Sequence, residues 1–556
     1  MVLRLLRVLA VLAGGLAVAT GCAANTTPAE TSGGVFRVNM QFEPDTIDPG
    51  RSNNNLSWGV ASQVFEGLFR YDKDLKLAPA VASEVPTREN GGVSEDGRTY
   101  TIRLRESHWS DGRPVRAQDF VYAIKRSLDP AFAAPYAQAL YDIEGAEAYN
   151  TAPGAKTKPS QAGSPQIAAL RAAVAVYAAD DATLTLRLNA PRSTFVHLLA
   201  QPVAWPLRED VLTTFGDKWT APPNYLGNGP FVLTVWEHGS RIVFEPNPYY
   251  AEGKPKLQQL VFVQIGDANQ AFLAYRNGEL DAVGVPDAAV KQVEADPGLK
   301  AEALRVKELF ILGLQVNVTQ PPLQDVRVRQ AFATAIDRQA LVAGVAQGVG
   351  TPAYSPVPPG MPGHEAAVGQ EFTFDAAKAR RLLADAGFPD PARFPKVSLT
   401  FTETSPNRLR AEFFQAQLRQ NLGVQMDLEA LDAKAYQQRY ATGQFNLALS
   451  GWGADYPDPD NFVPELFTTG SGNNRTGYSN PAVDALARDC RSLADEKARM
   501  AACAKAQALV VADQPWIFTN YRERFWLVKP YVRGLQPTAK DAVVGSRFYR
   551  QLSIAR

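Results

Sequence analysis

The residues best suited to chemistry lie in one short stretch, residues 450–462. Trp452, Asp455 and Tyr456 stand close together there, in an irregular segment that follows a strand-like run at residues 445–449. A carboxylate among aromatic side chains can pair with a buried ammonium group, whose burial without a counter-charge is costly. The chemistry of this stretch would therefore be cation binding. The simpler interpretation is that Asp455 only caps a turn before a proline.

Two further acidic residues follow this site, Asp458 and Asp460, in an alternating Asp-Pro sequence. Such alternation is common in turns, because both residue types favour turn conformations. We therefore expect both carboxylates to be solvated. Their negative charge would also favour a cationic ligand nearby.

Motifs for catalysis are absent from the sequence. It contains no Gly-x-Ser-x-Gly nucleophile turn, no His-Glu-x-x-His pair and no Gly-x-x-x-x-Gly-Lys phosphate loop. The four histidines lie far apart in the chain, and nothing pairs any of them with a nucleophile: His108, His197, His238 and His364. We predict that the protein is not an enzyme and uses neither a metal ion nor a cofactor.

The charge balance is neutral, with 57 basic and 57 acidic side chains among 556 residues. Proteins that bind nucleic acids rely on clustered Lys and Arg, and the sequence has no such cluster, so a nucleic-acid partner is excluded. The length exceeds the roughly 250 to 300 residues at which one hydrophobic core stops growing. Two or more domains are therefore expected.

The N-terminus has the pattern of a secretory signal. Arg4 and Arg7 precede an apolar stretch that is shorter than the roughly 20 residues of a membrane-spanning helix. The small residues immediately before Cys22 resemble a bacterial lipobox. We expect residues 1–21 to be removed, Cys22 to be lipid-modified and residues 22–35 to form a flexible tether. A plain secretory signal cut near the same place is the alternative.

The two remaining cysteines, Cys490 and Cys503, lie in a segment that reads as helix, turn, helix, with helices at residues 481–490 and 497–511. Outside the cytoplasm, two cysteines this close in sequence favour a disulfide. Closing so short a loop would contribute about 3 kcal/mol to stability. A metal site would need two more ligands, and no histidine lies nearby.

The rest of the chain alternates strand-like and helical segments, which is typical of mixed α/β domains. Strands are predicted at residues 99–105, 183–188, 241–245 and 259–265. Helices are predicted at residues 117–128, 326–344, 374–386 and 408–422, of which the last two end at glycines.

Several short motifs follow one another along these elements. They are residues 43–49 (EPDTIDP), 64–68 (VFEGL), 96–105 (DGRTYTIRLR), 108–115 (HWSDGRPV), 119–122 (DFVY), 227–231 (GNGPF), 276–281 (RNGELD), 325–331 (DVRVRQA), 335–338 (AIDR) and 451–456 (GWGADY). In this order the chain resembles the extracytoplasmic solute-binding proteins of family 5, which are the oligopeptide- and dipeptide-binding proteins of ABC importers. The resemblance runs from about residue 36 to the C-terminus.

The resemblance implies an α/β fold of the periplasmic-binding-protein type (type II, cluster C). Two lobes would be joined by a pair of crossing strands, with a ligand cleft between them. Lobe I would comprise residues 36–55, 182–309 and 526–556, an inserted subdomain residues 56–181, and lobe II residues 310–525.

The function implied by the resemblance is capture of short peptides by closure of the two lobes. The protein would act as a monomer, anchored by its lipid to the outer face of the bacterial membrane or held in the periplasm. It would deliver peptides to ABC permease subunits driven by cytosolic ATPases. Other cargoes of the same fold stay open, namely nickel chelates, haem or oligosaccharides, as does a lipoglycan-related regulatory role. A sugar would stack on tryptophans such as Trp58, Trp205 and Trp452.

The resemblance also suggests ligand contacts. Asp455 matches the family's aspartate that binds the peptide amino terminus. Glu43 matches an acidic residue on the first strand near the ligand, and Tyr136 matches an aromatic residue of the inserted subdomain that lines the cleft. Trp452 and Tyr456 would either support the pocket wall or touch the ligand.

The chain departs from the family pattern at two places in and before the Gly-Trp motif. Gly453, which we expect to border the ligand, stands where some relatives have a cysteine, so a cross-link there is absent. The basic residue that precedes the motif in oligopeptide-specific relatives is also missing. Arg408, Arg410 or Arg439 could instead receive the peptide carboxylate in bidentate geometry, unless they are ordinary exposed helix residues.

Overall fold

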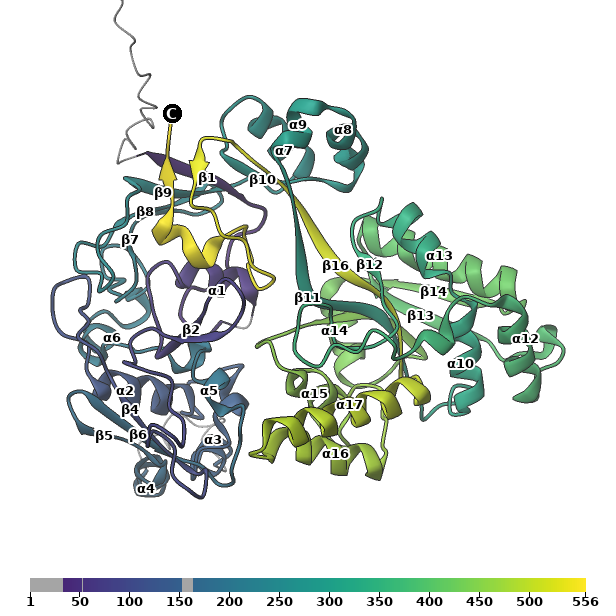
Figure 1. The fold of residues 1–556 in the computed structure, drawn as a ribbon, viewed down its shortest axis with the longest axis horizontal. Helices are drawn as coiled ribbons and strands as arrows, with labels where there is room; N and C mark the ends of the chain where they lie inside the picture. The colour runs from purple at the N-terminus through teal and green to yellow at the C-terminus, as the bar shows by residue number, and fades with distance from the viewer. Residues whose placement is uncertain (1–33, 53, 153–163) are drawn as a thin grey trace, which may run out of the picture.

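Two bodies make up the computed structural model, which describes residues 34–52, 54–152 and 164–556 (Figure 1). The expected signal peptide, Cys22 and most of the tether lie outside these residues. Two long strands, β11 (Ala303–Val316) and β16 (Trp516–Val528), join the bodies. We call the body that contains the N-terminal strand lobe I and the other body lobe II.

The two joining strands pair with each other along most of their length. One half of the antiparallel pair runs from Ala303 opposite Leu527 to Lys307 opposite Glu523, and the other half continues from Ile311 opposite Tyr521. The register shifts between Lys307 and Ile311. The irregularity lies where the strands pass from one lobe to the other, which is where a hinge would bend.

Lobe I is built on one end of a large sheet. Among the described residues this sheet has eleven strands, and it continues through β11 and β16 into lobe II. In lobe I its strands are β10 (Ala282–Gly284), β1 (Val35–Met40), β9 (Gln259–Gln264), β8 (Arg241–Pro246) and β7 (Phe231–Glu237). Lobe I also contains the helices α1 (Asn55–Ala61), α5 (Phe195–Leu198) and α6 (Glu209–Phe215). Three more pack around the β10 and β16 ends: α7 (Ala268–Arg276), α8 (Val290–Ala295) and α9 (Pro297–Ala301).

The C-terminal segment returns to lobe I after β16. It forms β17 (Val532–Arg533), the 3₁₀ turn η10 (Ser546–Gln551) and β18 (Ser553–Ile554). Tyr549 packs edge-on against Phe36 of β1, with ring centroids 5.3 Å apart. The two ends of the described chain therefore share one hydrophobic core.

A smaller sheet lies in the part of lobe I where an inserted subdomain was predicted. Its strand order is β4 (Thr99–Arg103), β6 (Thr183–Arg187) and β5 (Val176–Asp180). It is accompanied by β2 (Phe69–Tyr71), β3 (Leu77–Pro79), α2 (Ala117–Ser127), α3 (Ala146–Asn150) and α4 (Pro165–Ala173). Because β6 pairs with both neighbours, this sheet extends past residue 181, where the insert was expected to end.

Lobe II has its own hydrophobic core on the other end of the large sheet. Its strands are β14 (Met426–Leu431), β13 (Val397–Thr402), β15 (Leu447–Gly453) and the short β12 (Thr351–Pro352). Its helices are α10 (Val326–Ala335), α11 (Arg338–Ala340), α12 (Ala376–Asp385), α13 (Ser405–Leu422), α14 (Ala433–Ala441), α15 (Val463–Phe467), α16 (Pro481–Ser492) and α17 (Glu496–Asp513).

The α/β class and most predicted elements are confirmed, but the helix predicted at residues 326–344 is broken. α10 ends at Ala335, and the Asp337 side chain then caps α11. The break places Arg338 in the core, where its guanidinium donates hydrogen bonds to the carbonyl oxygens of Ala333, Ala353 and Phe518. Those buried carbonyl oxygens need hydrogen-bond donors, and the Arg338 side chain at the break supplies them. The spacing of apolar residues in the sequence does not reveal this requirement.

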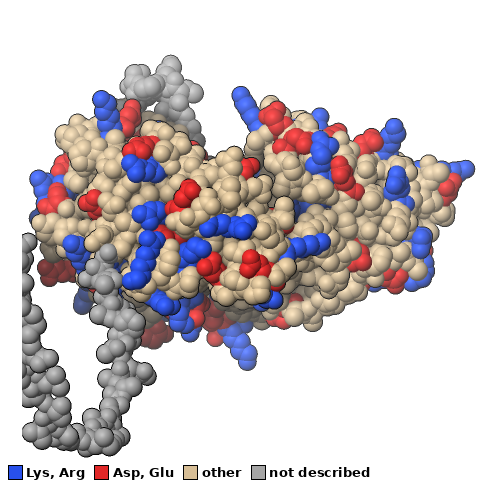
Figure 2. Space-filling view, turned by 90° about the horizontal axis from the view of Figure 1, so that it is seen from above, with Lys and Arg blue, Asp and Glu red and all other residues tan. Residues whose placement is uncertain are grey.

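The predicted disulfide is present and joins Cys490 of α16 to Cys503 of α17. Among the described residues, no helix combines the length and apolar character needed to cross a membrane. On the face seen in Figure 2, basic and acidic side chains are interspersed, in keeping with the neutral charge balance.

Candidate functional site

The strand before the candidate site is longer than predicted. β15 continues to Gly453 because it pairs with β11, with Gly451 opposite Leu312 and Gly453 opposite Phe310. A Cβ atom on Gly451 would lie 2.4 Å from the Phe310 ring. The prediction that residues 450–453 are irregular was therefore wrong, since the glycines make room for this ring within the sheet.

Asp455 follows β15 in a loop that lies against lobe I. The Ala454 N–H donates to the Leu309 carbonyl at 2.9 Å, and the Asp455 N–H donates to Oδ1 of Asn461 at 2.8 Å. Gln201 of lobe I donates to the Asp455 carbonyl at 2.8 Å. The loop backbone is thus held from both lobes.

The Asp455 carboxylate receives only neutral donors. Its Oδ1 accepts from the Tyr136 hydroxyl and its Oδ2 accepts from the Asn461 amide, both at 3.3 Å. No Lys, Arg or His of the described residues forms an ion pair with it. Burial raises the pKa of Asp455, an effect that the nearby Lys540 opposes. The carboxylate therefore lacks a direct cationic partner.

Lys540 is a site residue that sequence reasoning missed. Its ammonium donates to the Ala454 carbonyl at 2.8 Å and also to the Asp455 carbonyl. Its side chain comes from the C-terminal segment of lobe I, and the residue is only 8% exposed. Burial lowers the pKa of Lys540 to about 7, with Arg547 adding to the effect and Asp455 opposing it. No local sequence signal surrounds Lys540.

Asp460 forms a buried polar link between the lobes. It is fully buried and accepts from the Tyr456 hydroxyl and the Thr194 hydroxyl, both at 2.7 Å. Arg192 of lobe I contacts it at 3.1 Å, and Arg491 of lobe II at 2.7 Å. Burial alone would raise the pKa of Asp460, but the two guanidinium groups hold it well below its usual range.

The expectation that Asp458 and Asp460 are solvated was therefore wrong. Asp458 is only 4% exposed and forms a bidentate pair with Arg499, at 3.0 and 2.6 Å. Buried carboxylates need such partners, and folding supplies them from distant parts of the chain.

Tyr456 and Trp452 belong to the wall of the site. The Tyr456 ring stacks on His197, which in turn stacks on Tyr71, with ring centroids 5.7 and 5.9 Å apart. Trp452 donates from Nε1 to the Asn461 carbonyl at 2.8 Å. These contacts fix the loop that carries Asp455.

Glu43 lies in a separate polar cluster. It accepts hydrogen bonds from Trp236 Nε1 at 2.8 Å and from the Gly239 N–H at 3.1 Å, and it pairs with His238. Burial would raise the pKa of Glu43, but these hydrogen bonds lower it overall. The structure brings Tyr136, but not Glu43, into contact with Asp455.

The three candidate arginines differ in whether their guanidinium groups already pair with a carboxylate. Arg408 pairs with Glu403, with Nε 2.9 Å from its carboxylate, and Arg439 pairs with Glu429 at 2.6 Å. Within the described part of the chain, the Arg410 side chain makes no hydrogen bond or ion pair. Burial lowers the pKa of Arg410, while Asp287 of lobe I acts in the opposite direction. Arg410 is therefore the candidate whose guanidinium has no acidic partner among the described residues.

A narrow cavity lined by residues of both lobes lies beside this site. Gly453, Ala454 and Phe310 line it from the lobe II side, and Asn55 and Lys540 line it from lobe I. Trp58 and Trp205, considered as sugar platforms, are both buried. No group of His, Cys, Asp and Glu that could hold a metal ion occurs among the described residues.

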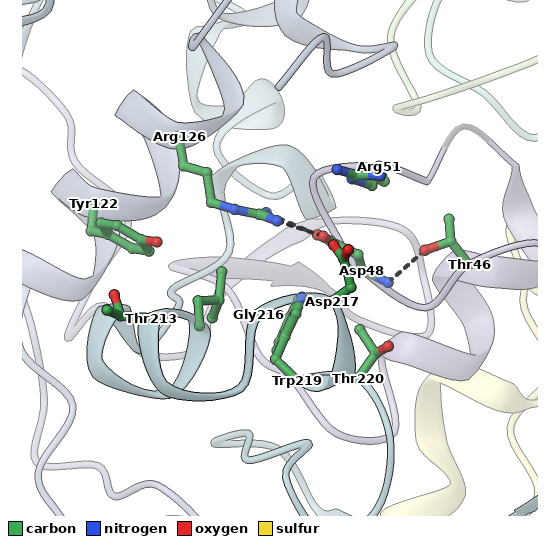
Figure 3. Close-up of a pocket in the computed structure, with 11 residues that line it drawn as sticks. Thr46, Asp48, Arg51, Tyr122, Arg126, Thr213, Gly216, Asp217, Trp219 and Thr220 are labelled. Atoms are coloured by element: carbon green, nitrogen blue, oxygen red, sulfur yellow. Dashed lines mark hydrogen bonds and ion pairs between the residues drawn. The ribbon is translucent and has the colours of Figure 1, made fainter. Parts of the chain in front are cut away.

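A larger cavity of about 480 Å³ lies elsewhere in lobe I, where α2 and α6 meet the segment after β1 (Figure 3). Arg126 and Asp48 point toward each other across it and form a bidentate pair, at 3.1 and 2.7 Å. Arg51 and Arg126 also lie over the Phe132 ring. The Arg126 and Asp48 charges of this cavity are thus paired with each other, and Asp455 is not among the lining residues.

The sequence and the fold are similar to those of known proteins. The family model of bacterial extracellular solute-binding proteins, family 5 Middle, matches residues 76–474. The oligopeptide-binding protein OppA of Bacillus subtilis (strain 168) is 31% identical over 511 residues, which cover 90% of each chain. The dipeptide-binding protein DppE of the same organism is 32% identical over 534 residues, which cover 93% of each chain. The crystal structure of Haemophilus influenzae OppA in complex with RPPGFSPFR matches with a TM-score of 0.74 and 27% identity, covering 95% of this chain and 100% of that one.

Proposed function

The chain belongs to the bacterial extracellular solute-binding proteins of family 5, and we propose on this premise that it captures short peptides between its lobes for an ABC importer. The observation that carries the proposal is the Asp455 carboxylate, which lies at the contact between the lobes without a cation of its own. A peptide brings an α-ammonium group whatever its side chains. Burying that ammonium requires a carboxylate and further acceptors.

Asp455 supplies the carboxylate, and its neighbours hold it in place. Asn461 of the same lobe donates to one carboxylate oxygen, so it can orient the group before a ligand arrives, and Tyr136 of lobe I donates to the other oxygen when the lobes meet. An incoming ammonium would restore the ionised state that burial disfavours. The site is therefore suited to a free amino terminus.

At the other end of the ligand, we assign the peptide carboxylate to Arg410. Its lack of a partner among the described residues supports this choice, as does the occupation of Arg408 and Arg439 by glutamates. An arginine can bind a carboxylate through two parallel hydrogen bonds. The length of the peptide would be set by the distance between the Asp455 and Arg410 sites.

Capture would depend on closure about β11 and β16. Contacts from both lobes exist only when the lobes meet, so a ligand that uses both shifts the population toward the closed state. The Tyr136 contact to Asp455 is one such contact across the lobes. The closed form would be what a membrane permease recognises.

The remaining parts of the proposal concern the site of action. Residues 1–21 would direct export, a lipid on Cys22 would anchor the protein to the outer face of the membrane, and a monomer would serve permease subunits driven by cytosolic ATPases. The N-terminal sequence and the family support these assignments.

Calorimetry with the mature chain tests the peptide site. Asp455→Asn should weaken binding of trialanine by about a hundredfold, because the ammonium loses its counter-charge. N-acetylated trialanine should bind poorly to the parent protein. Asp74→Asn is the matched control, since it removes the same charge from an exposed residue paired with Lys73. Equal affinity of the Asp455 variant and the parent would refute the assignment, and mass spectrometry of a copurified ligand would identify the natural cargo.

A further inference from the structure

A second cavity adjoins the Asp455 site on the lobe I side. Asn55 and Lys540 line both this cavity and the narrow cavity between the lobes. Its other walls come from α1, the segment after α5 and the C-terminal turn η10, through Trp58, Gln201 and Arg547 among others. We call it the donor cavity. Its volume of about 30 Å³ leaves room for about two water-sized groups.

Three residues that line this cavity each carry a buried donor group with no hydrogen-bond partner. The groups are Trp58 Nε1, the Ser546 hydroxyl and Arg547 Nε. Trp58 is 8% exposed and Ser546 is 3% exposed, so bulk water does not satisfy these groups. Buried polar groups in folded proteins nearly always have partners. Orphaned donors gathered around one cavity indicate that an acceptor belongs there.

The charges of the donor cavity are also unbalanced. Lys540 and Arg547 line it, and no Asp or Glu does so. The acidic groups that act on these cations are Asp455 on Lys540 and Asp541 on Arg547, and neither acid forms an ion pair with its cation. Burial lowers the pKa of both cations, and Arg547 further lowers the pKa of Lys540. An anion in the cavity would relieve both effects.

We propose that the donor cavity receives a carboxylate of the bound peptide, so that the protein prefers acidic peptides. The inference rests on the proposed function, since the carboxylate must come with a ligand that Asp455 holds. The cavity size suits the two oxygens of a carboxylate. Because Lys540 and Gln201 both donate to the Asp455 carbonyl, the carboxylate must belong to a residue close to the bound amino terminus. Its source is an Asp or Glu side chain, since the terminal carboxylate is assigned to Arg410.

Calorimetry with matched peptides tests this inference. Ala-Glu-Ala-amide should bind the parent about tenfold tighter than Ala-Gln-Ala-amide, as expected for charge-assisted hydrogen bonds. Arg547→Gln should reduce that ratio to below about threefold, and Ser546→Ala, which only removes one orphan donor, should reduce it partly. Arg393→Gln is the control, because it removes the same charge from an exposed residue paired with Asp390 and should keep the parent ratio.

The outcomes separate the inference from the proposed function. If the parent binds Ala-Gln-Ala-amide but does not favour Ala-Glu-Ala-amide, the donor-cavity inference fails and the peptide site stands. If the parent binds neither of these peptides nor trialanine, the proposed function itself fails. An unchanged ratio in both Arg547→Gln and Ser546→Ala, with melting temperatures that show folded proteins, would also overturn the inference.

Discussion

Arg192 makes the most informative single contact between the lobes. Its Nη2 donates to Asp460 at 3.1 Å and to the Tyr456 hydroxyl at 3.2 Å, and both acceptors belong to lobe II. Arg192→Gln would remove this link. Asp460 would keep Arg491, Tyr456 and Thr194 as partners, so no buried charge would be orphaned.

The expected magnitude follows from these contacts. A hydrogen bond to a charged group contributes about 1.5 to 3 kcal/mol, and we expect about 2 kcal/mol because the carboxylate stays paired. A loss of about 2 kcal/mol lowers the equilibrium constant for closure by about thirtyfold. If ligand binding requires the closed state and the ligand-free protein is mostly open, the apparent Kd rises by the same factor.

Calorimetry on Arg192→Gln, with trialanine as ligand, measures this change. Arg491→Gln is the matched control, because it removes a 2.7 Å contact to the same carboxylate within lobe II. We expect the control to lower the melting temperature but to change Kd by less than about threefold, since closure does not depend on it. Small-angle scattering should show a more open ligand-free form for Arg192→Gln alone. Equal Kd changes in the two variants, or no change in either, would refute the link between this contact and closure.

Three further predictions concern the sheet, the pH dependence and the disulfide. Gly451→Ala places a Cβ atom 2.4 Å from an aromatic ring of β11 and should lower the free energy of unfolding by about 1 to 3 kcal/mol in urea titrations, whereas Gly472→Ala, with nothing within 4 Å, should change it little. Because Lys540 has a pKa of about 7, the preference for Ala-Glu-Ala-amide over its glutamine counterpart should fall as pH rises from about 6 to 8, and a constant ratio would contradict its role. Replacing both Cys490 and Cys503 by serine should cost about 3 kcal/mol, seen as a lower melting temperature, and reductant should have the same effect on the parent but none on the variant.

Sequence reasoning succeeded where the physical cause is local. Cys490 and Cys503 are 13 residues apart, and the helices that carry them are defined by their own residues. Gly423 likewise ends α13 through its own left-handed backbone conformation. Strand and helix positions in both lobes follow from such short-range patterns.

The charged environment of the site could not be predicted in this way. Arg192 lies 268 residues from Asp460, and Lys540 lies 85 residues from Asp455. A local turn pattern shows that a carboxylate can be exposed, but it cannot show which distant cation will form an ion pair with it. The resemblance to a family pointed to Asp455, and only the fold showed that Lys540 contacts its carbonyl oxygen and also lines the donor cavity.

The shared core of the chain ends has a consequence for the order of folding. Residues 310–525 form the second hydrophobic core almost by themselves, so this part can fold as soon as it emerges. The first core also needs the final segment, because Tyr549 packs on Phe36 and Arg556 pairs with Asp281 at 2.9 Å. If the chain crosses a membrane N-terminus first, its first strands therefore cannot complete their hydrophobic core until the C-terminal residues have crossed. We expect truncation after residue 528 to leave lobe I unable to fold, while lobe II stays compact.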